Sequence, residues 1–223
     1  MAGVEFPYKT IKDVDVANKR ILMRTDYNVP LKEDGSIADD FRIVASLPTI
    51  NYLVDRGAMV VLMAHLGRPK GQVNEKYSLA PVAERLSELL KRPVTFVPDC
   101  IGEPVAKVAE AMQPGQVILL ENLRFHPEEE KNDPAFAEQL AKSSHAELFV
   151  QDGFGVVHRP HASTEAITKF LPSVAGLLLE KEYVEIKSAT DAPNRPLTAV
   201  IGGAKISDKM PLVRKFMQIA DNV

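Results

Sequence analysis

The hydrophobic pattern of the chain alternates between short apolar runs and longer stretches that carry apolar residues at helical spacing. We predict strands at Arg20–Thr25, Met59–Met63, Val94–Val97, Val117–Leu120 and Leu148–Val150. These runs lack the period-two alternation of half-exposed strands, which is typical of a parallel sheet covered by helices on both faces. The alternation of strands and helices therefore predicts an α/β fold with a parallel sheet.

Helices are predicted between these strands. The segment 40–56 carries Val44, Leu47, Ile50, Leu53 and Val54 at helical spacing, and Gly57 follows its end as a cap. Further helices are expected at Leu79–Leu90, Glu103–Met112 and Asp133–Ser143. The last of these has Asp133 as its N-cap and Pro134 at the first helical position, the usual start signal of a helix.

The character of the chain changes near Leu177. Leu177–Ala189 is a charged helical stretch, and Thr190–Pro196 is rich in turn-forming residues, so we interpret 177–196 as a connecting helix and linker between a first domain, 1–176, and the segment 197–223. That segment contains one expected strand, Leu197–Ile201, a glycine turn and one helix, Asp208–Ala220. A lone βα unit has no sheet to join, so we expect it to open a second domain and, while exposed, to allow self-association.

Composition narrows the classes of function. The chain has 223 residues, 45% of them hydrophobic, which suffices for a packed core, and its formal net charge of -3 argues against a nucleic-acid-binding surface. The single cysteine, Cys100, excludes an internal disulfide, suits a reducing compartment and is interpreted as a packed small hydrophobe. Without a secretion signal or a long apolar run, we expect a cytoplasmic protein with no membrane partner.

Three short basic motifs each follow a predicted strand: HLGR at 65–68, LRF at 123–125 and HRPH at 158–161. The carboxyl ends of parallel strands lie on one edge of a sheet, and ligands of open α/β sheets bind outside that edge. The motifs should therefore converge, and an edge lined with arginine and histidine favours an anion such as phosphate or carboxylate.

Each motif taken alone has an ordinary explanation. Arg68 would suit a surface salt bridge, and the arginine at 124 could pair with Glu121, while 128–130 reads as a solvated acidic face. His158 and His161 invite a zinc site, but no third ligand has matching spacing and Pro160 disfavours a helix there, so we assign no metal ligand.

Two further segments carry candidate chemistry. Asp26 and Asn28 follow the first strand and can hydrogen-bond a hydroxylated ligand, although such residues before proline also form ordinary turns. The turn GGAK at 202–205 leads into a helix with Lys205 and Lys209 one turn apart, which suits a phosphate but is also consistent with a simple packing turn. The first strand lacks a G-x-G-x-x-G motif after it, which excludes a dinucleotide-dependent dehydrogenase.

Six motifs together resemble one family. RTDYNVPL, DFRI, HLGRPKG, ENLRFHPEE, DGFGVVHRPHAST and GGAKISDK occur in the order and spacing of phosphoglycerate kinase, over essentially the whole chain. The resemblance implies a three-layer α/β/α, Rossmann-like domain that binds 3-phosphoglycerate or 1,3-bisphosphoglycerate, and a second domain that binds Mg-ATP or Mg-ADP. It also implies a glycolytic role, and a monomer as in most of the family.

The resemblance also implies roles for single residues. Asp26 and Asn28 would contact the hydroxyl and carboxyl end of the substrate, and Arg42 would stabilise the phosphoryl group in flight. The basic patch that holds the 3-phosphate and the carboxylate would consist of His65, Arg68, Arg124, Arg159 and His161. Lys205 would meet the transferring phosphoryl group, and Lys209 the nucleotide phosphates.

The implied chemistry needs no general base, because the nucleophile in ATP consumption is a carboxylate already ionised at neutral pH. Catalysis then consists of in-line positioning and of neutralising charge with arginine, lysine and Mg²⁺, helped by closure of two domains. The family continues for about as many residues again, so we expect this chain to hold the substrate half. Two hypotheses stay open: a carboxyl kinase with the activity of the intact protein, and a module that binds a phosphorylated acid without transferring phosphate.

Overall fold

The computed structural model describes residues 4–191, 195–203 and 206–223. It divides into two compact units, one of Tyr8–Glu180 and one of the described parts of Met1–Pro7 and Lys181–Val223. All the strands of the described residues lie in Tyr8–Glu180, in the order β1 (Arg20–Arg24), β2 (Met59–Met63), β3 (Val94–Val97), β4 (Val117–Leu120), β5 (Leu148–Gln151) and β6 (Ser173–Ala175).

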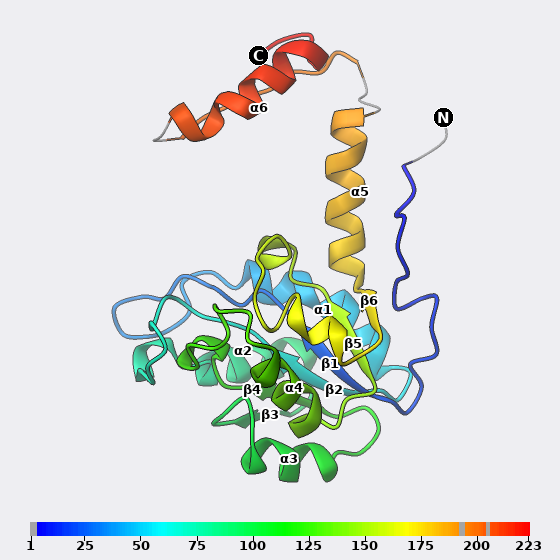
Figure 1. Ribbon diagram of the computed structural model, residues 1–223, viewed down its shortest axis with the longest axis vertical. Coiled ribbons are helices and arrows are strands. Elements are labelled where there is room, and N and C mark those ends of the chain that lie inside the picture. The colour runs from blue at the N-terminus through cyan, green and yellow to red at the C-terminus, as the bar shows by residue number, and fades with distance from the viewer. Residues whose placement is uncertain (1–3, 192–194, 204–205) are drawn as a thin grey trace. The chain divides into compact units, whose positions relative to one another are not determined.

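The strands form one six-stranded sheet in the order β3-β4-β2-β1-β5-β6, and neighbouring strands pair in parallel (Figure 1). At the centre, Arg24 at the end of β1 is level with Met63 of β2 and Gln151 of β5. This register places the carboxyl ends of the three strands side by side, with the loops that follow them on the same edge.

Helices cover both faces of the sheet. The α-helices of the unit are α1 (Phe41–Val54), α2 (Ala80–Leu90), α3 (Glu103–Glu110), α4 (Pro134–Ser143) and the start of α5 (Leu177–Asp191); the 3-10 helices are η1 (Glu75–Tyr77), η2 (Leu123–Phe125), η3 (Phe154–Val156) and η4 (Ala166–Lys169). Helices α1 and α2 pack on one face, and α3 and α4 pack on the other. The fold is thus the expected three-layer α/β/α arrangement.

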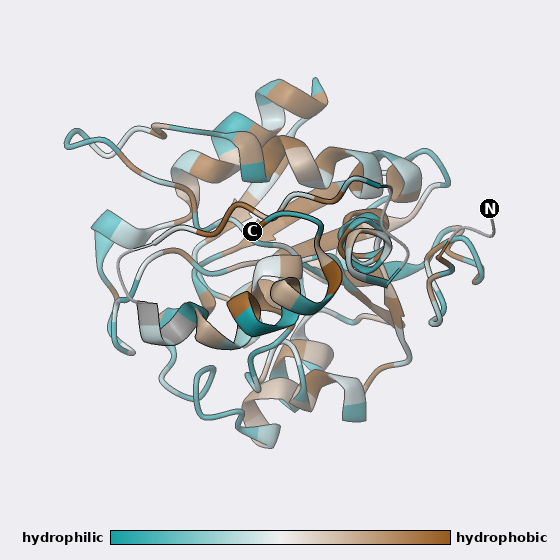
Figure 2. Cartoon of the chain, turned by 90° about the horizontal axis from the view of Figure 1, so that it is seen from above, coloured by the Kyte–Doolittle hydropathy of each residue, from teal (hydrophilic) through white to brown (hydrophobic). Residues whose placement is uncertain are grey.

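Strand residues divide alternately between the two faces. Ile21 and Met23 belong to the hydrophobic cluster under α1 and α2, whereas Leu22 lies in the cluster under α3 and α4. A strand covered on both faces therefore needs apolar residues at consecutive positions, which explains the continuous apolar runs of the central strands. Figure 2 shows the strands in brown and the helices with brown and teal positions interleaved, as expected when each helix has one buried side.

The predicted N-cap of α4 is confirmed: the Asp133 side chain accepts a hydrogen bond from the Phe136 backbone N–H at 2.9 Å. Helix α1 differs in one respect. Val44 has helical apolar spacing but is 41% exposed, because it faces a surface cavity rather than the sheet.

The segment after the linker departs from prediction. The expected strand Leu197–Ile201 is absent: Thr198 makes only an isolated parallel bridge with Asn222. A strand needs a partner along its length, and here the main-chain pairing is confined to 197–199 against 221–222. The expected helix is present as α6 (Ile206–Ile219), so the predicted βα unit keeps its helix and loses its strand.

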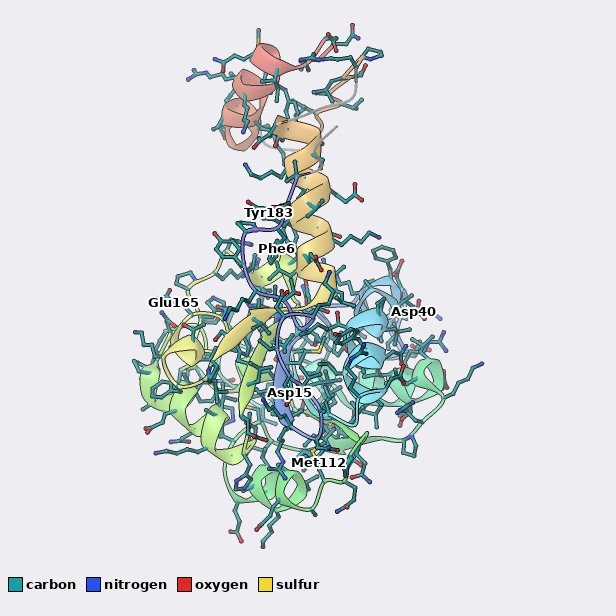
Figure 3. The ribbon with its side chains drawn as sticks, turned by 90° about the vertical axis from the view of Figure 1, so that its right-hand side faces the viewer. Phe6, Asp15, Asp40, Met112, Glu165 and Tyr183 are labelled. Atoms are coloured by element: carbon teal, nitrogen blue, oxygen red, sulfur yellow. The ribbon has the colours of Figure 1, made fainter. Side chains whose placement is uncertain are left out.

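Contacts within the smaller unit include an ion pair between Arg195 and Asp221 at 2.8 Å. The Phe6 ring meets the Tyr183 ring of α5 edge-on, with centroids 5.2 Å apart (Figure 3). Several apolar side chains of 195–223 are exposed, including Val200 at 95% and Met217 at 70%. Among the described helices, none has the length and apolar character needed to cross a bilayer.

Candidate anion-binding site

The three basic motifs meet at the carboxyl edge of the sheet. His65 lies two residues after β2, Arg124 lies in η2 after β4, and Arg159 follows η3 after β5. His65 is buried, and its pKa is lowered, first by burial and then by the positive charges of Arg24, Arg124 and Arg159. The imidazole is therefore neutral at physiological pH, inside a group of arginines.

Arg24 is the centre of this group. It ends β1 and is 1% exposed. Its Nε donates to Ser163 Oγ at 2.9 Å, its Nη1 donates to the Thr25 carbonyl at 2.7 Å, and its Nη2 lies 3.2 Å from His65 Nδ1. The sequence analysis placed Arg24 in the first strand and assigned it no role. Its position as a charged residue at the end of an apolar strand could have marked it as part of the site.

Glu129 supplies the buried negative charge beside these arginines. It is fully buried, accepts hydrogen bonds from Ser163 Oγ at 2.6 Å and Ser163 N at 2.9 Å, and lies 3.7 Å from His161 Nδ1. Burial alone would raise its pKa, but His161, Arg24 and Ser163 outweigh burial and hold the pKa below its ordinary value. The prediction of a solvated face at 128–130 is wrong for Glu129, because the chain folds back over this carboxylate.

Arg124 is held by Gly67 and Glu130. Its Nη1 donates to the Gly67 carbonyl at 2.9 Å, and its Nη2 lies 3.1 Å from Glu130 Oε1. Glu121, the partner that sequence proximity suggested, instead accepts from Ser78 Oγ and from the Leu79 backbone N–H. That alternative is wrong, because Glu121 turns toward the start of α2.

Two of the arginines keep an unused donor. The Nε atoms of Arg124 and Arg159 are buried and have no hydrogen-bond partner among the described residues. Burial is the main cause of the lowered pKa of Arg124, and the charges of Arg159 and Arg68 lower it further. Arg68 itself is exposed at the rim. Unpaired buried donors on clustered cations are costly, and an anion would satisfy them.

Asp26, Asn28 and Arg42 lie at a second part of the same edge. The Arg42 guanidinium forms an ion pair with the Asp26 carboxylate, and Asn28 Oδ1 accepts a hydrogen bond from the Gly67 backbone N–H at 2.8 Å. Asn28 thus ties the loop after β1 to the HLGR loop. Gly155 packs against this pair, since a Cβ on it would collide with the Asp26 carboxylate.

His161 and His158 diverge in the structure. His161 is buried against Glu129, whereas His158 is exposed. His161 therefore belongs to the edge through its contact with Glu129.

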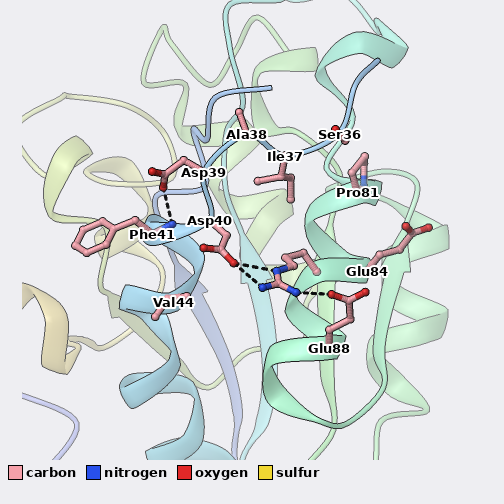
Figure 4. Close-up of a pocket in the computed structure, with 11 residues that line it drawn as sticks. Ser36, Ile37, Ala38, Asp39, Asp40, Phe41, Val44, Pro81, Glu84 and Glu88 are labelled. Carbon is pink, nitrogen blue, oxygen red and sulfur yellow. Dashed lines mark hydrogen bonds and ion pairs between the residues drawn. The ribbon is translucent and has the colours of Figure 1, made fainter. Parts of the chain in front are cut away.

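A cavity of about 850 Å³ lies apart from these arginines, between the loop 36–40, α1 and α2 (Figure 4). Its one arginine, Arg85, is paired with Asp40 at 2.8 Å and with Glu88 at 2.5 Å. Asp39 and Glu84 add further negative charge. This cavity therefore does not suit an anion, in contrast to the sheet edge.

The glycine turn before α6 is described in part. Lys205 lies outside the described residues. Lys209 lies close to the turn, since a Cβ on Gly203 would sit 3.0 Å from its Cε, and both residues line a cavity of about 250 Å³. Gly203 thus lies beside the Lys209 ammonium group, an arrangement that suits a phosphate.

Fold and site together define a class of protein: a three-layer α/β protein with an anion-binding edge built from arginines with unused donors. The family model for phosphoglycerate kinase matches residues 11–223, and the chain belongs to that family.

Relatives agree with this assignment. The chain is 54% identical over 214 residues to the phosphoglycerate kinase of Moorella thermoacetica and 52% identical over 215 residues to that of Pelotomaculum thermopropionicum; each match covers 96% of this chain and 54% of the relative. It superposes on the phosphoglycerate kinase structure from Coxiella burnetii with a TM-score of 0.82 at 36% identity, covering 96% of this chain and 53% of that one. It superposes on the phosphoglycerate kinase structure from Pyrococcus horikoshii OT3 with a TM-score of 0.85 at 34% identity, covering 94% of this chain and 52% of that one. The chain spans about half the length of the curated relatives it matches.

Proposed function

We propose that this chain is the substrate half of a glycolytic phosphoglycerate kinase, which transfers a phosphoryl group reversibly between 1,3-bisphosphoglycerate and ADP. The observation that carries the proposal is the pair of buried, unpartnered Nε atoms of Arg124 and Arg159 beside the neutral His65. Two guanidinium groups with free donors suit the phosphate and the carboxylate of a three-carbon acid.

The balance of charge supports an anionic ligand. Arg24, Arg124 and Arg159 act electrostatically on one another, and Glu129 is the main buried counter-charge. Burial lowers the pKa of Arg24 and of Arg124, so desolvated positive charge is left over at this edge. A dianionic phosphate would offset that excess and satisfy the open donors together.

Asp26, Asn28 and Arg42 are proposed to orient the reacting end of the substrate. Asp26 would accept a hydrogen bond from the substrate hydroxyl, and Asn28 would donate its amide N–H to the carboxyl end. Arg42, whose side chain is 47% exposed and paired with Asp26, would move its charge to the phosphoryl group during transfer.

The chemistry needs no general base, because the attacking carboxylate is already ionised at neutral pH. Lys209 beside Gly203 fits a nucleotide phosphate, and Lys205 is proposed to meet the transferring phosphoryl group. Mg²⁺ bound with ATP or ADP would neutralise charge on the phosphates.

The domain roles follow from this function. We propose that 1–176 binds the phosphoglycerate, that 177–196 connects, and that 197–223 begins the nucleotide-binding domain. The partners are then small molecules, and the proposed compartment is the cytoplasm, where glycolysis supplies them.

Calorimetric titration of the chain with 3-phosphoglycerate tests the site. Arg124→Ala should weaken binding by about 1.5–3 kcal/mol, the usual contribution of a hydrogen bond to a charged group. Arg85→Ala, which removes a paired arginine from the acidic cavity, is the matched control and should leave affinity unchanged. Equal affinity of Arg124→Ala and the unaltered chain would refute the assignment.

An assay with Mg-ATP on the same preparation separates the two functional hypotheses. Phosphoryl transfer would show that this chain is itself a kinase. Binding of 3-phosphoglycerate without transfer would show that this chain acts as a binding module and that the activity belongs to the longer protein.

A further inference from the structure

We propose that Asp99, Cys100 and His126 form a binding site for a zinc-type divalent ion, separate from the anion site. One ligand atom from each residue lies within 4.8 Å of the other two, and Asp99 Oδ1 is 2.9 Å from His126 Nε2. The proposal does not depend on the proposed kinase function. Sequence spacing does not indicate this cluster, because His126 is 26 residues from Cys100.

The fold brings the three residues together through neighbouring strands. Asp99 and Cys100 follow β3, and His126 follows η2 after β4, so both loops leave the same edge of paired strands. The Glu121 backbone N–H donates to the Asp99 carbonyl at 3.3 Å, which holds the two loops against each other. The ligand atoms are thus positioned by main-chain contacts and not by an exposed flexible segment.

The donor set suits zinc. Carboxylate oxygen, thiolate sulfur and imidazole nitrogen are its three usual protein ligands, and a tetrahedral ion with bonds of about 2.0–2.3 Å would space them by about 3.3–3.6 Å. Asp99 Oδ1 and His126 Nε2 are closer than that spacing, and the other separations are no more than 4.8 Å, so side-chain rotations would bring the three atoms to a shared ion. Three protein ligands would leave the fourth position to water.

The surroundings supply a wall and an entrance. Cys100 is 1% exposed and packs in the apolar cluster with Phe136, whose ring centroid is 5.2 Å from that of His126. The Asp99 side chain is 41% exposed and that of His126 is 28% exposed, so an ion can enter from solvent. An apolar wall behind a ligand set limits solvent access to the ion and lowers the local dielectric.

Other roles for this cluster fit less well. Burial raises the pKa of the Cys100 thiol, and the Asp99 charge raises it further, so Cys100 is not a reactive thiolate without an ion. On binding, the ion would replace the thiol proton, which leaves to solvent. It would also replace the Nε2 proton that His126 donates to Asp99 Oδ1, so that Nε2 coordinates and the ring proton is carried on Nδ1.

Cobalt(II) titration of the reduced chain tests the proposal, with Co²⁺ standing in for Zn²⁺. Cys100 is the only cysteine, so a thiolate-to-cobalt charge-transfer band in the near ultraviolet can come only from this residue. We expect that band, its bleaching by one equivalent of Zn²⁺, and no competition from Mg²⁺, which prefers oxygen ligands.

Variants separate this site from adventitious binding. Cys100→Ser should abolish the band, and His126→Gln should weaken Co²⁺ binding at least about tenfold. His126 is half-buried, so His126→Gln tests the proposal even if Cys100→Ser fails to fold. His145→Asn is the matched control, since His145 is exposed with a φ of 49°, which asparagine tolerates, and it should leave binding unchanged. No band in the unaltered chain, or an equal affinity in His126→Gln, would overturn the proposal.

Discussion

Asp152 offers a sharp test of how burial sets the charge of a carboxyl group in this fold. It follows β5, is 1% exposed, and its Oδ1 accepts hydrogen bonds from the backbone N–H groups of Leu178 (2.9 Å) and Leu179 (3.4 Å) at the start of α5. Its Oδ2 is buried without a partner among the described residues. Replacing Asp152 by asparagine keeps an acceptor for α5 and removes the ionisable group.

The sign and size of the effect follow from the shifted pKa. Burial raises the pKa of Asp152 from 3.8 to about 6, against the opposing hydrogen bonds from Thr49 and from α5. A folded-state pKa above the unfolded value stabilises the fold fully below about pH 3.8, and that stabilisation is lost as pH rises through about 6. With about 1.36 kcal/mol per pKa unit, ionised Asp152 costs the folded state on the order of 3 kcal/mol at neutral pH.

Urea unfolding at a series of pH values measures this cost. The free energy of unfolding of Asp152→Asn, minus that of the unaltered chain, should rise by about 2–3 kcal/mol between pH 4 and pH 7.5. Asp133→Asn is the control, because it makes the same substitution at the N-cap of α4. A difference that stays flat across this range would refute the reasoning.

Two further substitutions test the site. Glu129→Gln should lower the free energy of unfolding at pH 7 by about 3 kcal/mol, because it removes a buried charge that accepts two hydrogen bonds from Ser163. Because the pKa of Glu129 is lowered in the folded state, the difference in unfolding free energy between Glu129→Gln and the unaltered chain should shrink as pH falls below about 4.5. Urea unfolding measures this difference, and a difference that stays constant with pH would contradict the buried-charge explanation. Gly155→Ala should weaken 3-phosphoglycerate binding by about 1.5 kcal/mol, because the added Cβ would displace the Asp26 carboxylate. Gly202→Ala, where a Cβ meets nothing within 4 Å, is its control in the same titration, and equal affinities of the two variants would contradict the role of Asp26.

Most elements of the first 176 residues could be predicted because their signals are local. Continuous apolar runs gave β1 to β5 to within a residue at either end, and apolar periodicity with caps gave α1 to α4 to within two. Strand β6 was missed because Ser173–Ala175 is too short to show a pattern. The expected strand Leu197–Ile201 failed for the opposite reason, since an apolar run becomes a strand only where a neighbour pairs with it.

The sequence by itself determined the parallel sheet, its covered faces and the presence of three basic motifs at strand ends, because apolar runs, helical spacing and motif positions are local features of the chain. Only the tertiary structure decided the strand order, the pairing of Arg124 with Glu130, and the burial of Glu129 between Ser163 and His161. These pairings join residues from separate loops. They form because folding buries these side chains beside one another, where a charged group needs a partner of opposite charge or a hydrogen bond. A carboxylate at 128–130 looks alike in the sequence whether it faces water or a buried arginine, and the folded chain alone distinguishes the two.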